Sequence, residues 1–293
     1  MEILVQQIIS GLATGGIYGS VALALVMIYQ ATDVVNYAQG EMAMFSTYLA
    51  WTMINAGLPY WVAFFGTLLV SFIGGVLIER IVIRPVEGAP ILTIVIVCIG
   101  LLVILNSVAG WIYSYIQKPF PSPFPPRPIM LGTVVFGAHD VGAIVVTLVV
   151  LAFLYAFFRF TTLGLAMRAA AQNPLSSRLC GIRVGWMLAI GWGLAAAIGA
   201  VAGMMTASAL GGLDFNMMLT VLLYALAAAV LGGLESPLGA VIGGLLLGVA
   251  LNLVAMWHVV GSSLKLPVGL GIILLVLVFR PNGLFGRTVV RKV

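Results

Sequence analysis

Long apolar runs separated by short polar segments extend from one end of the chain to the other. A helical run of about 20 apolar residues matches the hydrocarbon core of a bilayer. These runs lack the alternation of polar and apolar residues expected of strands in a membrane barrel. The pattern therefore predicts an all-α, polytopic transmembrane bundle of about eight or nine spans. The expected spans lie near residues 5–29, 37–55, 61–83, 91–116, 139–159, 186–209, 216–233, 238–257 and 265–279.

The second run differs from the others because polar residues stand at or within its inner end. These are Asn36, Gln39 and Glu41, and such groups are costly in hydrocarbon unless they face protein, water or headgroups. The run is either a full span or a broken or re-entrant one. On a helix, Glu41 would lie about one turn from Tyr37 and Phe45. It would then either line a cavity or hold two helices together.

Small residues recur at intervals of four, which is the spacing that lets membrane helices approach closely. Such stripes favour tight helix packing, and the alternative is an interface that slides or rocks during function. The glycines that we assign to helix packing are Gly11, Gly15, Gly19, Gly199, Gly203 and Gly243.

Composition supports the membrane interpretation. Of the 293 residues, 62% are hydrophobic and only 7% are charged, and the mean hydropathy is +1.20. That is too little polar surface to cover a soluble globule. We therefore expect residues 1–293 to form a single membrane domain, with no room for a sizeable soluble domain beside so many spans.

The few charges indicate an orientation. Basic residues collect at the ends of the expected spans rather than on one face, so the net charge of +5 indicates topology rather than a nucleic-acid partner. The positive-inside rule predicts an outer N-terminus and a cytoplasmic C-terminus. On the inner side this counts Arg80, Arg84, Arg280, Arg287, Arg291, Lys292 and the arginines of 159–183; on the outer side it counts Lys118, Arg127 and Lys265.

The inner loop 161–183 carries signals for a short helix. Asn173 suits the N-cap, Pro174 the first turn and Gly181 the position just past the end, which predicts a helix from about 174 to 180. Arg168 and Arg178 flank it. The loop is either an ordinary topogenic loop or a rigid knob that transmits force.

The outer loop 117–138 begins with a proline-rich stretch, residues 117–128. Its prolines exclude a regular helix, so we expect extended or turn-rich backbone. Such a stretch serves either as a stiff connector or as a docking surface.

Several kinds of chemistry have no motif here. The sequence holds no HExxH, no GxSxG and no phosphate-binding GxxxxGK[ST], so ATP hydrolysis by that route would need another subunit. Cys98 and Cys180 indicate neither a disulfide framework nor a metal site. We expect no enzyme activity and no cofactor. No span carries a row of ionisable residues, which disfavours an ion-coupled carrier.

Four segments carry a family resemblance. They are 36–42 (NYAQGEM), 164–182 (GLAMRAAAQNPLSSRLCGI), 232–240 (GGLESPLGA) with the glycines of 242–244, and 279–286 (FRPNGLFG). Together they resemble the LivH-type permeases of branched-chain amino acid ABC importers, the LivH/LivM family, and the resemblance extends over nearly the whole chain.

This resemblance implies a multi-pass subunit of the bacterial inner membrane. Its expected partners are a second related permease, two cytoplasmic ATPase subunits and a periplasmic solute-binding protein. Loop 161–183 would couple to the ATPase through Arg168, Asn173, Pro174, Arg178 and Gly181. Asn36, Gly40 and Glu41 would lie near the substrate path. The family often has His where this chain has Gln39, so a role that needs imidazole there is not expected.

The implied function is inward transport of branched-chain, hydrophobic amino acids by alternating access, driven by the partner ATPases. One alternative is the same importer class carrying urea, short amides or another small solute. A related sugar-type permease is a further alternative. Outside the class, the alternatives are an ion-coupled secondary carrier and a membrane-embedded enzyme, and the scattered polar residues argue against the latter.

Overall fold

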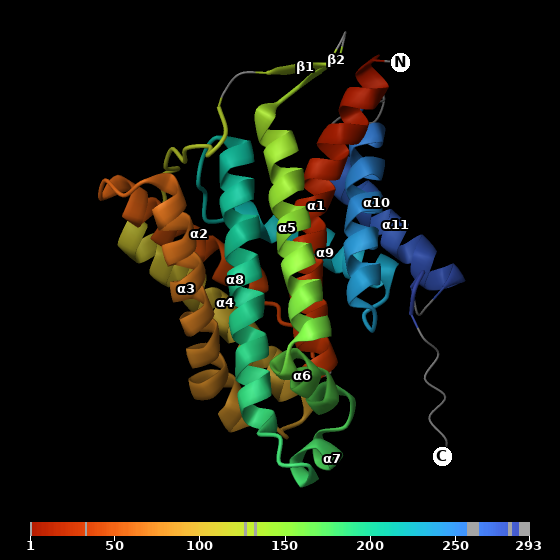
Figure 1. Cartoon of the computed structure of the whole chain (residues 1–293). Coiled ribbons are helices and arrows are strands. Elements are labelled where there is room, and N and C mark those ends of the chain that lie inside the picture. The colour runs from red at the N-terminus through yellow and green to blue at the C-terminus, as the bar shows by residue number, and fades with distance from the viewer. Residues whose placement is uncertain are drawn as a thin grey trace.

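The computed structural model describes residues 2–32, 34–125, 128–131, 134–256, 264–280 and 283–286, and Figure 1 shows their arrangement. The α-helices are α1 (Glu2–Thr32), α2 (Gln39–Asn55), α3 (Tyr60–Ile78), α4 (Ile91–Tyr113), α5 (Ala138–Phe160), α6 (Thr162–Gln172), α7 (Pro174–Leu179), α8 (Val184–Leu210), α9 (Met217–Gly232), α10 (Pro237–Ala255) and α11 (Lys265–Phe279). The π-helix η1 (Glu79–Ile83) and the 3-10 helix η2 (Arg84–Val86) continue α3. A small antiparallel hairpin pairs β1 (Ile129–Leu131) with β2 (Val134–Phe136).

Each expected span coincides with a helix, which confirms the all-α membrane bundle. Six helices of the described chain are long and apolar enough to cross a membrane: α1, α3 with its continuation, α4, α5, α8 and α10. The other three are shorter, with 17 residues in α2, 16 in α9 and 15 in α11. At 1.5 Å per residue, none of the three alone reaches across a hydrocarbon core of about 30 Å. The helix of the second expected span begins at Gln39, so Tyr37 lies outside it.

Two long helices form the centre of the bundle. Within the most apolar 18-residue window of each helix, 83% of the residues are buried in α1 and 78% in α8, compared with 11% in α4. The buried faces of α1 and α8 consist mainly of glycine, alanine and other small residues, which let neighbouring helices approach closely. α4 instead exposes large aliphatic side chains along its length, as expected of a helix that faces lipid or another subunit.

The chain contains two halves with the same order of elements, α1–α4 and α8–α11. Each half has a long helix, a non-helical break, a short helix and two further helices. The first helix of each half packs against the third helix of the other, α1 on α10 and α8 on α3. Figure 1 shows α1 and α8 running in opposite directions along the bundle, so the halves have inverted topology, an arrangement common in membrane transport proteins.

Glycines occupy the closest helix crossings. A Cβ on Gly15 would lie 2.8 Å from the carbonyl oxygen of Gly244 in α10, and a Cβ on Gly11 would lie 2.7 Å from Val249 Cα. Gly19 continues this line, with a Cβ position 3.1 Å from the carbonyl of Val241. Side chains at these positions would push the backbones apart.

The other glycines assigned to packing also face neighbouring helices. A Cβ on Gly203 would lie 2.7 Å from the carbonyl oxygen of Ala43 in α2, and one on Gly243 would overlap the carbonyl of Ala228 in α9. Both face a backbone carbonyl that cannot turn away, and Gly203 also faces the hydroxyl of Thr47, so alanine would require a shift of the helix.

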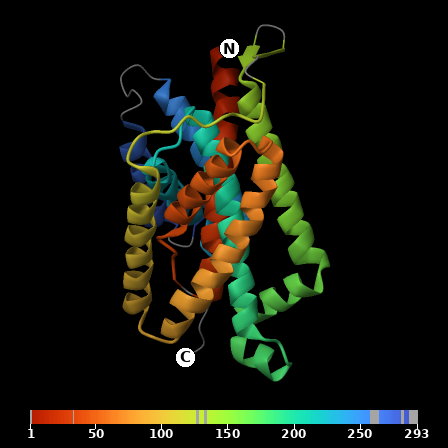
Figure 2. The same cartoon turned by 90° about the vertical axis from the view of Figure 1, so that its left-hand side faces the viewer.

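A non-helical strap, residues 114–125, crosses the end of the bundle that holds the N-terminus (Figure 2). The indole N–H of Trp51 donates to the carbonyl of Pro119 at 3.1 Å, and the hydroxyl of Ser208 donates to the carbonyl of Pro121 at 3.2 Å. The absence of helix in the described part of the proline-rich stretch agrees with the expectation. Arg127, Arg287, Arg291 and Lys292, used above for orientation, lie outside the described residues.

Candidate functional site

The break between α1 and α2 is a buried stretch of non-helical backbone. Val34, Asn36 and Ala38 are each at most 4% exposed. Backbone polar groups need partners when they are shielded from water. The Asn36 side-chain oxygen accepts a hydrogen bond from the N–H of Ala38 at 3.0 Å, and the Asn36 carbonyl accepts one from the N–H of Gln39 at 3.2 Å. Asn36 therefore shapes the turn that starts α2.

Gln39 connects this break to the central helix α8. The side chain is fully buried, and its amide nitrogen donates to the carbonyl of Ala195 at 2.8 Å. A Cβ on Gly199 would lie only 2.7 Å from the same nitrogen. Gly199, assigned from the sequence to helix packing, thus makes room for a polar link. No sequence pattern indicates the contact between Gln39 and Ala195, which are 156 positions apart.

Glu41 forms a second link across the bundle. It is 3% exposed, and its Oε2 accepts a hydrogen bond from the amide of Asn106 in α4 at 3.2 Å. The same amide donates to the carbonyl of Phe215 at 3.3 Å. Phe215 belongs to the break between α8 and α9, residues 211–216. The carboxylate therefore holds α2 and α4 together, which is one of the two roles considered for it. The Asn106 amide links this pair of helices to the second break.

Gly40 brings the starts of the two short helices together. A Cβ at this position would lie 3.2 Å from the carbonyl of Met218 and 3.2 Å from the side chain of Leu222, both in α9. The two breaks and the two short helices thus meet inside the bundle. This polar junction, defined by Asn36, Gln39, Glu41 and Asn106, is the densest group of buried polar contacts between helices in the described chain.

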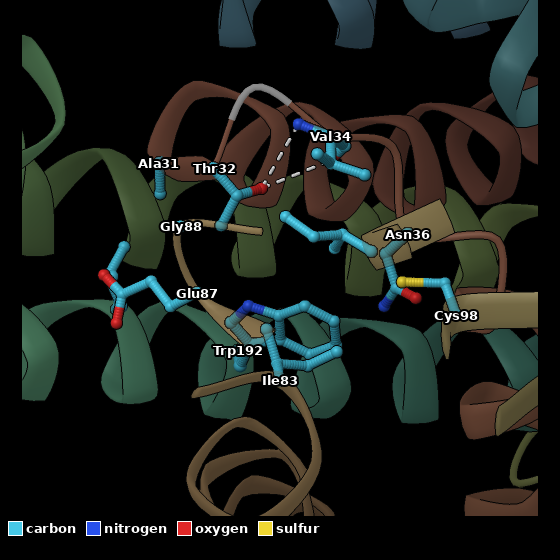
Figure 3. Close-up of a pocket in the computed structure, with 11 residues that line it drawn as sticks. Ala31, Thr32, Val34, Asn36, Ile83, Glu87, Gly88, Cys98 and Trp192 are labelled. Atoms are coloured by element: carbon cyan, nitrogen blue, oxygen red, sulfur yellow. Dashed lines mark hydrogen bonds between the residues drawn. The ribbon is translucent and has the colours of Figure 1, made fainter. Parts of the chain in front are cut away.

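A cavity of about 180 Å³ lies on one side of the junction, where α1 ends and α8 begins. It lies between the end of α1, η1 and the turn after it, α4, and α8 (Figure 3). Of the three residues expected near the substrate path, Asn36 lines it, whereas Gly40 and Glu41 do not. Its lining residues are Ala31, Thr32, Val34, Asn36, Ile83, Glu87, Gly88, Ile94, Cys98, Leu188 and Trp192.

Loop 161–183 forms two helices, α6 and α7, and α7 projects beyond the bundle (Figures 1 and 2). The side chain of Asn173 caps α7 by accepting from the N–H of Ser176 at 2.9 Å. Pro174 is the first helical residue, and Gly181 has φ +81° just past the end. This geometry confirms the short helix expected from the local signals, which ends at Leu179 instead of Cys180.

Two leucines that the sequence analysis did not single out dominate the surface of α7. Leu175 is 71% exposed and Leu179 is 83% exposed. They are four positions apart and therefore lie on the same helical face. Arg168 and Arg178 are also exposed. Apolar residues at i and i+4 in a short, charged loop helix are the signal that could have identified this face as a contact surface.

Comparison with known families decides which class of membrane protein this is. The family model described as "Branched-chain amino acid transport system / permease component" matches residues 7–279, almost the full chain. The chain belongs to this permease family. Permease components are transport subunits rather than enzymes, and the apolar helices make this permease a multi-pass membrane protein.

Similar proteins cover nearly the whole permease. The high-affinity branched-chain amino acid transport system permease protein BraD of Pseudomonas aeruginosa is 32% identical, over 98% of this chain and 97% of BraD. The corresponding LivH protein of Escherichia coli K12 is 29% identical, over 98% of this chain and 97% of its own. A probable branched-chain amino acid transport permease protein LivH of Methanocaldococcus jannaschii is 28% identical, over 80% of this chain and 76% of its own.

Proposed function

We propose that this permease is the membrane subunit through which an ABC importer carries branched-chain, hydrophobic amino acids into a bacterial cell. It would lie in the inner membrane beside a second related permease. Two cytoplasmic ATPase subunits would supply the energy, and a periplasmic binding protein would deliver the solute. The substrate is proposed from the similarity to BraD and LivH, whose names state branched-chain amino acid transport.

The observation that carries the proposal is the projecting helix α7. Its exposed leucines, Leu175 and Leu179, offer apolar area that has no partner within the described chain. Burying a leucine side chain contributes roughly 1.5–3 kcal/mol. An ATPase groove that received both leucines would therefore gain roughly 3–6 kcal/mol of binding free energy from them. Arg168 and Arg178 would add contacts to acidic groups at the rim. Asn173, Pro174 and Gly181 would hold the knob rigid.

A movement of α7 has a direct route to the polar junction. α7 is followed, after four residues, by the central helix α8. α8 receives the hydrogen bond from Gln39 at Ala195, so a shift of α8 would pull on the start of α2. ATP binding would supply the differential free energy that favours one of two arrangements. The solute path would then run beside Asn36, Gly40 and Glu41. At the glycine crossings, α1 and α10 would either rock against each other or stay fixed during this change.

The test is ATP-dependent leucine uptake into proteoliposomes that hold the complete complex. Two variants disrupt the proposed contact: Leu175→Asp with Leu179→Asp, and Arg168→Glu with Arg178→Glu. Arg159→Glu is the control, because Arg159 is exposed at the end of α5, outside α6 and α7.

We expect both double variants to assemble in the membrane and to lose most of the uptake and of the ATPase stimulation by the binding protein. Uptake by the Arg159→Glu variant should stay near that of the wild type. If the double variants transport normally, α7 is not the coupling contact. Uptake of another small solute in place of leucine would contradict the substrate and leave the importer class standing.

A further inference from the structure

The cavity beside the polar junction has the size of a small solute. Its volume of about 180 Å³ lies below the roughly 300–1,000 Å³ of pockets for drug-sized ligands. Its walls include the end of α1 and the first turns of α8, near the end of the bundle that carries α7, which the proposed orientation places in the cytoplasm. Neither the coupling contact nor the polar junction described above uses its walls, apart from Asn36.

One polar group in its wall lacks a partner. Trp192 is 2% exposed, and its indole nitrogen has no hydrogen-bond partner in the described part of the chain. In the view of Figure 3, this nitrogen lies on the edge of the indole turned toward Thr32 and Gly88. A buried indole N–H usually finds an acceptor, and leaving it unpaired costs free energy. The site therefore favours a ligand that brings an oxygen acceptor.

Asn36 supplies a second hydrogen-bond donor to the lining of the cavity. The amide nitrogen of Asn36 has only long contacts, 3.4 Å to the Gln39 side-chain oxygen and 3.6 Å to the sulfur of Met42. The first exceeds the usual 2.7–3.2 Å for a hydrogen bond from nitrogen to oxygen, and the second goes to a thioether sulfur, which is a weak acceptor. In Figure 3, Asn36 lies on the other side of the indole from the Trp192 nitrogen, so the two are separate donors. A carboxylate would accept a strong hydrogen bond from the unpaired indole N–H.

The rest of the lining complements the other parts of an amino acid. Glu87 is an exposed lining residue, and its negative charge would attract an ammonium group at that part of the wall. Ile83, Ile94 and Leu188 supply aliphatic wall. A charged or large polar side chain would find no partner among these three residues, whereas a branched aliphatic one would bury its methyl groups.

We propose that this cavity binds a free amino acid with an aliphatic side chain from the cytoplasm, its carboxylate accepting from Trp192 and its ammonium facing Glu87. The ligand class follows from the proposed function, since such a ligand would be the product of transport. An occupied cavity would bridge α1, the turn before α4, and α8. Because α8 is the helix that follows α7, occupancy would oppose its movement, so accumulated product would slow further import.

The first experiment measures binding of labelled leucine to the purified complex, prepared without binding protein and nucleotide. The variant Trp192→Phe keeps the ring and removes the N–H, and Trp111→Phe is the matched control because Trp111 is 84% exposed on α4. We expect saturable binding by the wild type and the control. The affinity of Trp192→Phe should be lower than that of the wild type by about tenfold or more, which is the effect of losing a hydrogen bond to a charged group. The exposed variant Glu87→Gln should also weaken binding, and it tests the site even if Trp192→Phe fails to fold.

The second experiment reads the consequence for transport. Proteoliposomes receive ATP and graded unlabelled leucine inside, and binding protein with labelled leucine outside. Internal leucine should lower the initial uptake and the rate of phosphate release in the wild type and in Trp111→Phe, but much less in Trp192→Phe. Internal glutamate should have no effect on any of them.

The outcomes separate this inference from the proposed function. If the wild type imports leucine but neither binds it without binding protein nor responds to internal leucine, the cavity is not a product site. Equal binding by the wild type, Trp192→Phe and Glu87→Gln would also overturn the inference. Failure of the wild type to import leucine at all would instead contradict the proposed substrate.

Discussion

The closest crossing of α1 and α10 yields a prediction whose magnitude follows from the structure. In Gly15→Ala, the new methyl group would lie 2.8 Å from the Gly244 carbonyl oxygen and 2.9 Å from Leu245 Cα. Non-bonded carbon atoms prefer separations of about 3.5–4.0 Å. Both obstacles are backbone atoms, so the helices must separate by roughly 0.5–1 Å. Overpacking of this kind costs about 1–3 kcal/mol.

The matched control is Gly100→Ala in α4. Gly100 is also helical, but nothing lies within 4 Å of its Cβ position. The assay is the thermal midpoint at which the solubilised complex loses its monodisperse peak in size-exclusion chromatography. By the scaling of soluble domains, the cost in Gly15→Ala corresponds to a fall of roughly 2–12 °C, whereas Gly100→Ala should not lower the midpoint. Equal midpoints for Gly15→Ala and the wild type would refute the reasoning that this crossing tolerates no side chain.

Three further substitutions test other contacts. Asn173→Ala removes the N-cap of α7, should cost the helix about 1 kcal/mol, and should lower leucine uptake, while Asn173→Asp should restore it; equal uptake by all three proteins would contradict a rigid knob. Trp51→Phe removes the hydrogen bond to Pro119, worth about 0.5–1.5 kcal/mol, and should speed proteolysis of the outer strap, so an unchanged cleavage rate would count against the contact. Glu41→Ala leaves the Asn106 amide with one partner and should lower the thermal midpoint, whereas Glu41→Gln, which keeps an oxygen acceptor, should lower it less; the reverse order would be inconsistent with the hydrogen bond.

The spans could be predicted from the sequence because their signal is local. A run of apolar residues can be recognised without knowing which helices pack around it. The expected span 186–209 starts two residues after α8 (Val184–Leu210) and ends one residue before it. Helix α7 could be predicted for the same reason, since Asn173, Pro174 and Gly181 act within one or two turns.

The polar junction could not be predicted, because its contacts join distant parts of the chain. Glu41 meets Asn106 across 65 positions, and Gln39 meets Ala195 across 156. The sequence identified Glu41 as unusual from the cost of a carboxylate in hydrocarbon, but the partner depends on how the helices pack. The spacing of Leu175 and Leu179 indicates a shared apolar face on the short helix, but only tertiary context decides whether such a face packs inward or lies exposed.

If partner ATPases drive amino-acid import through this permease, uptake must depend on ATP hydrolysis and not on an ion gradient. Labelled leucine uptake is followed in proteoliposomes containing the complete complex, with ATP or a non-hydrolysable analogue inside and binding protein outside, first with sodium and proton gradients collapsed and then with a gradient applied. We predict concentrative uptake with ATP in both cases and none with the analogue. Uptake with the analogue that requires an ion gradient would show a secondary carrier and contradict ATP-driven import.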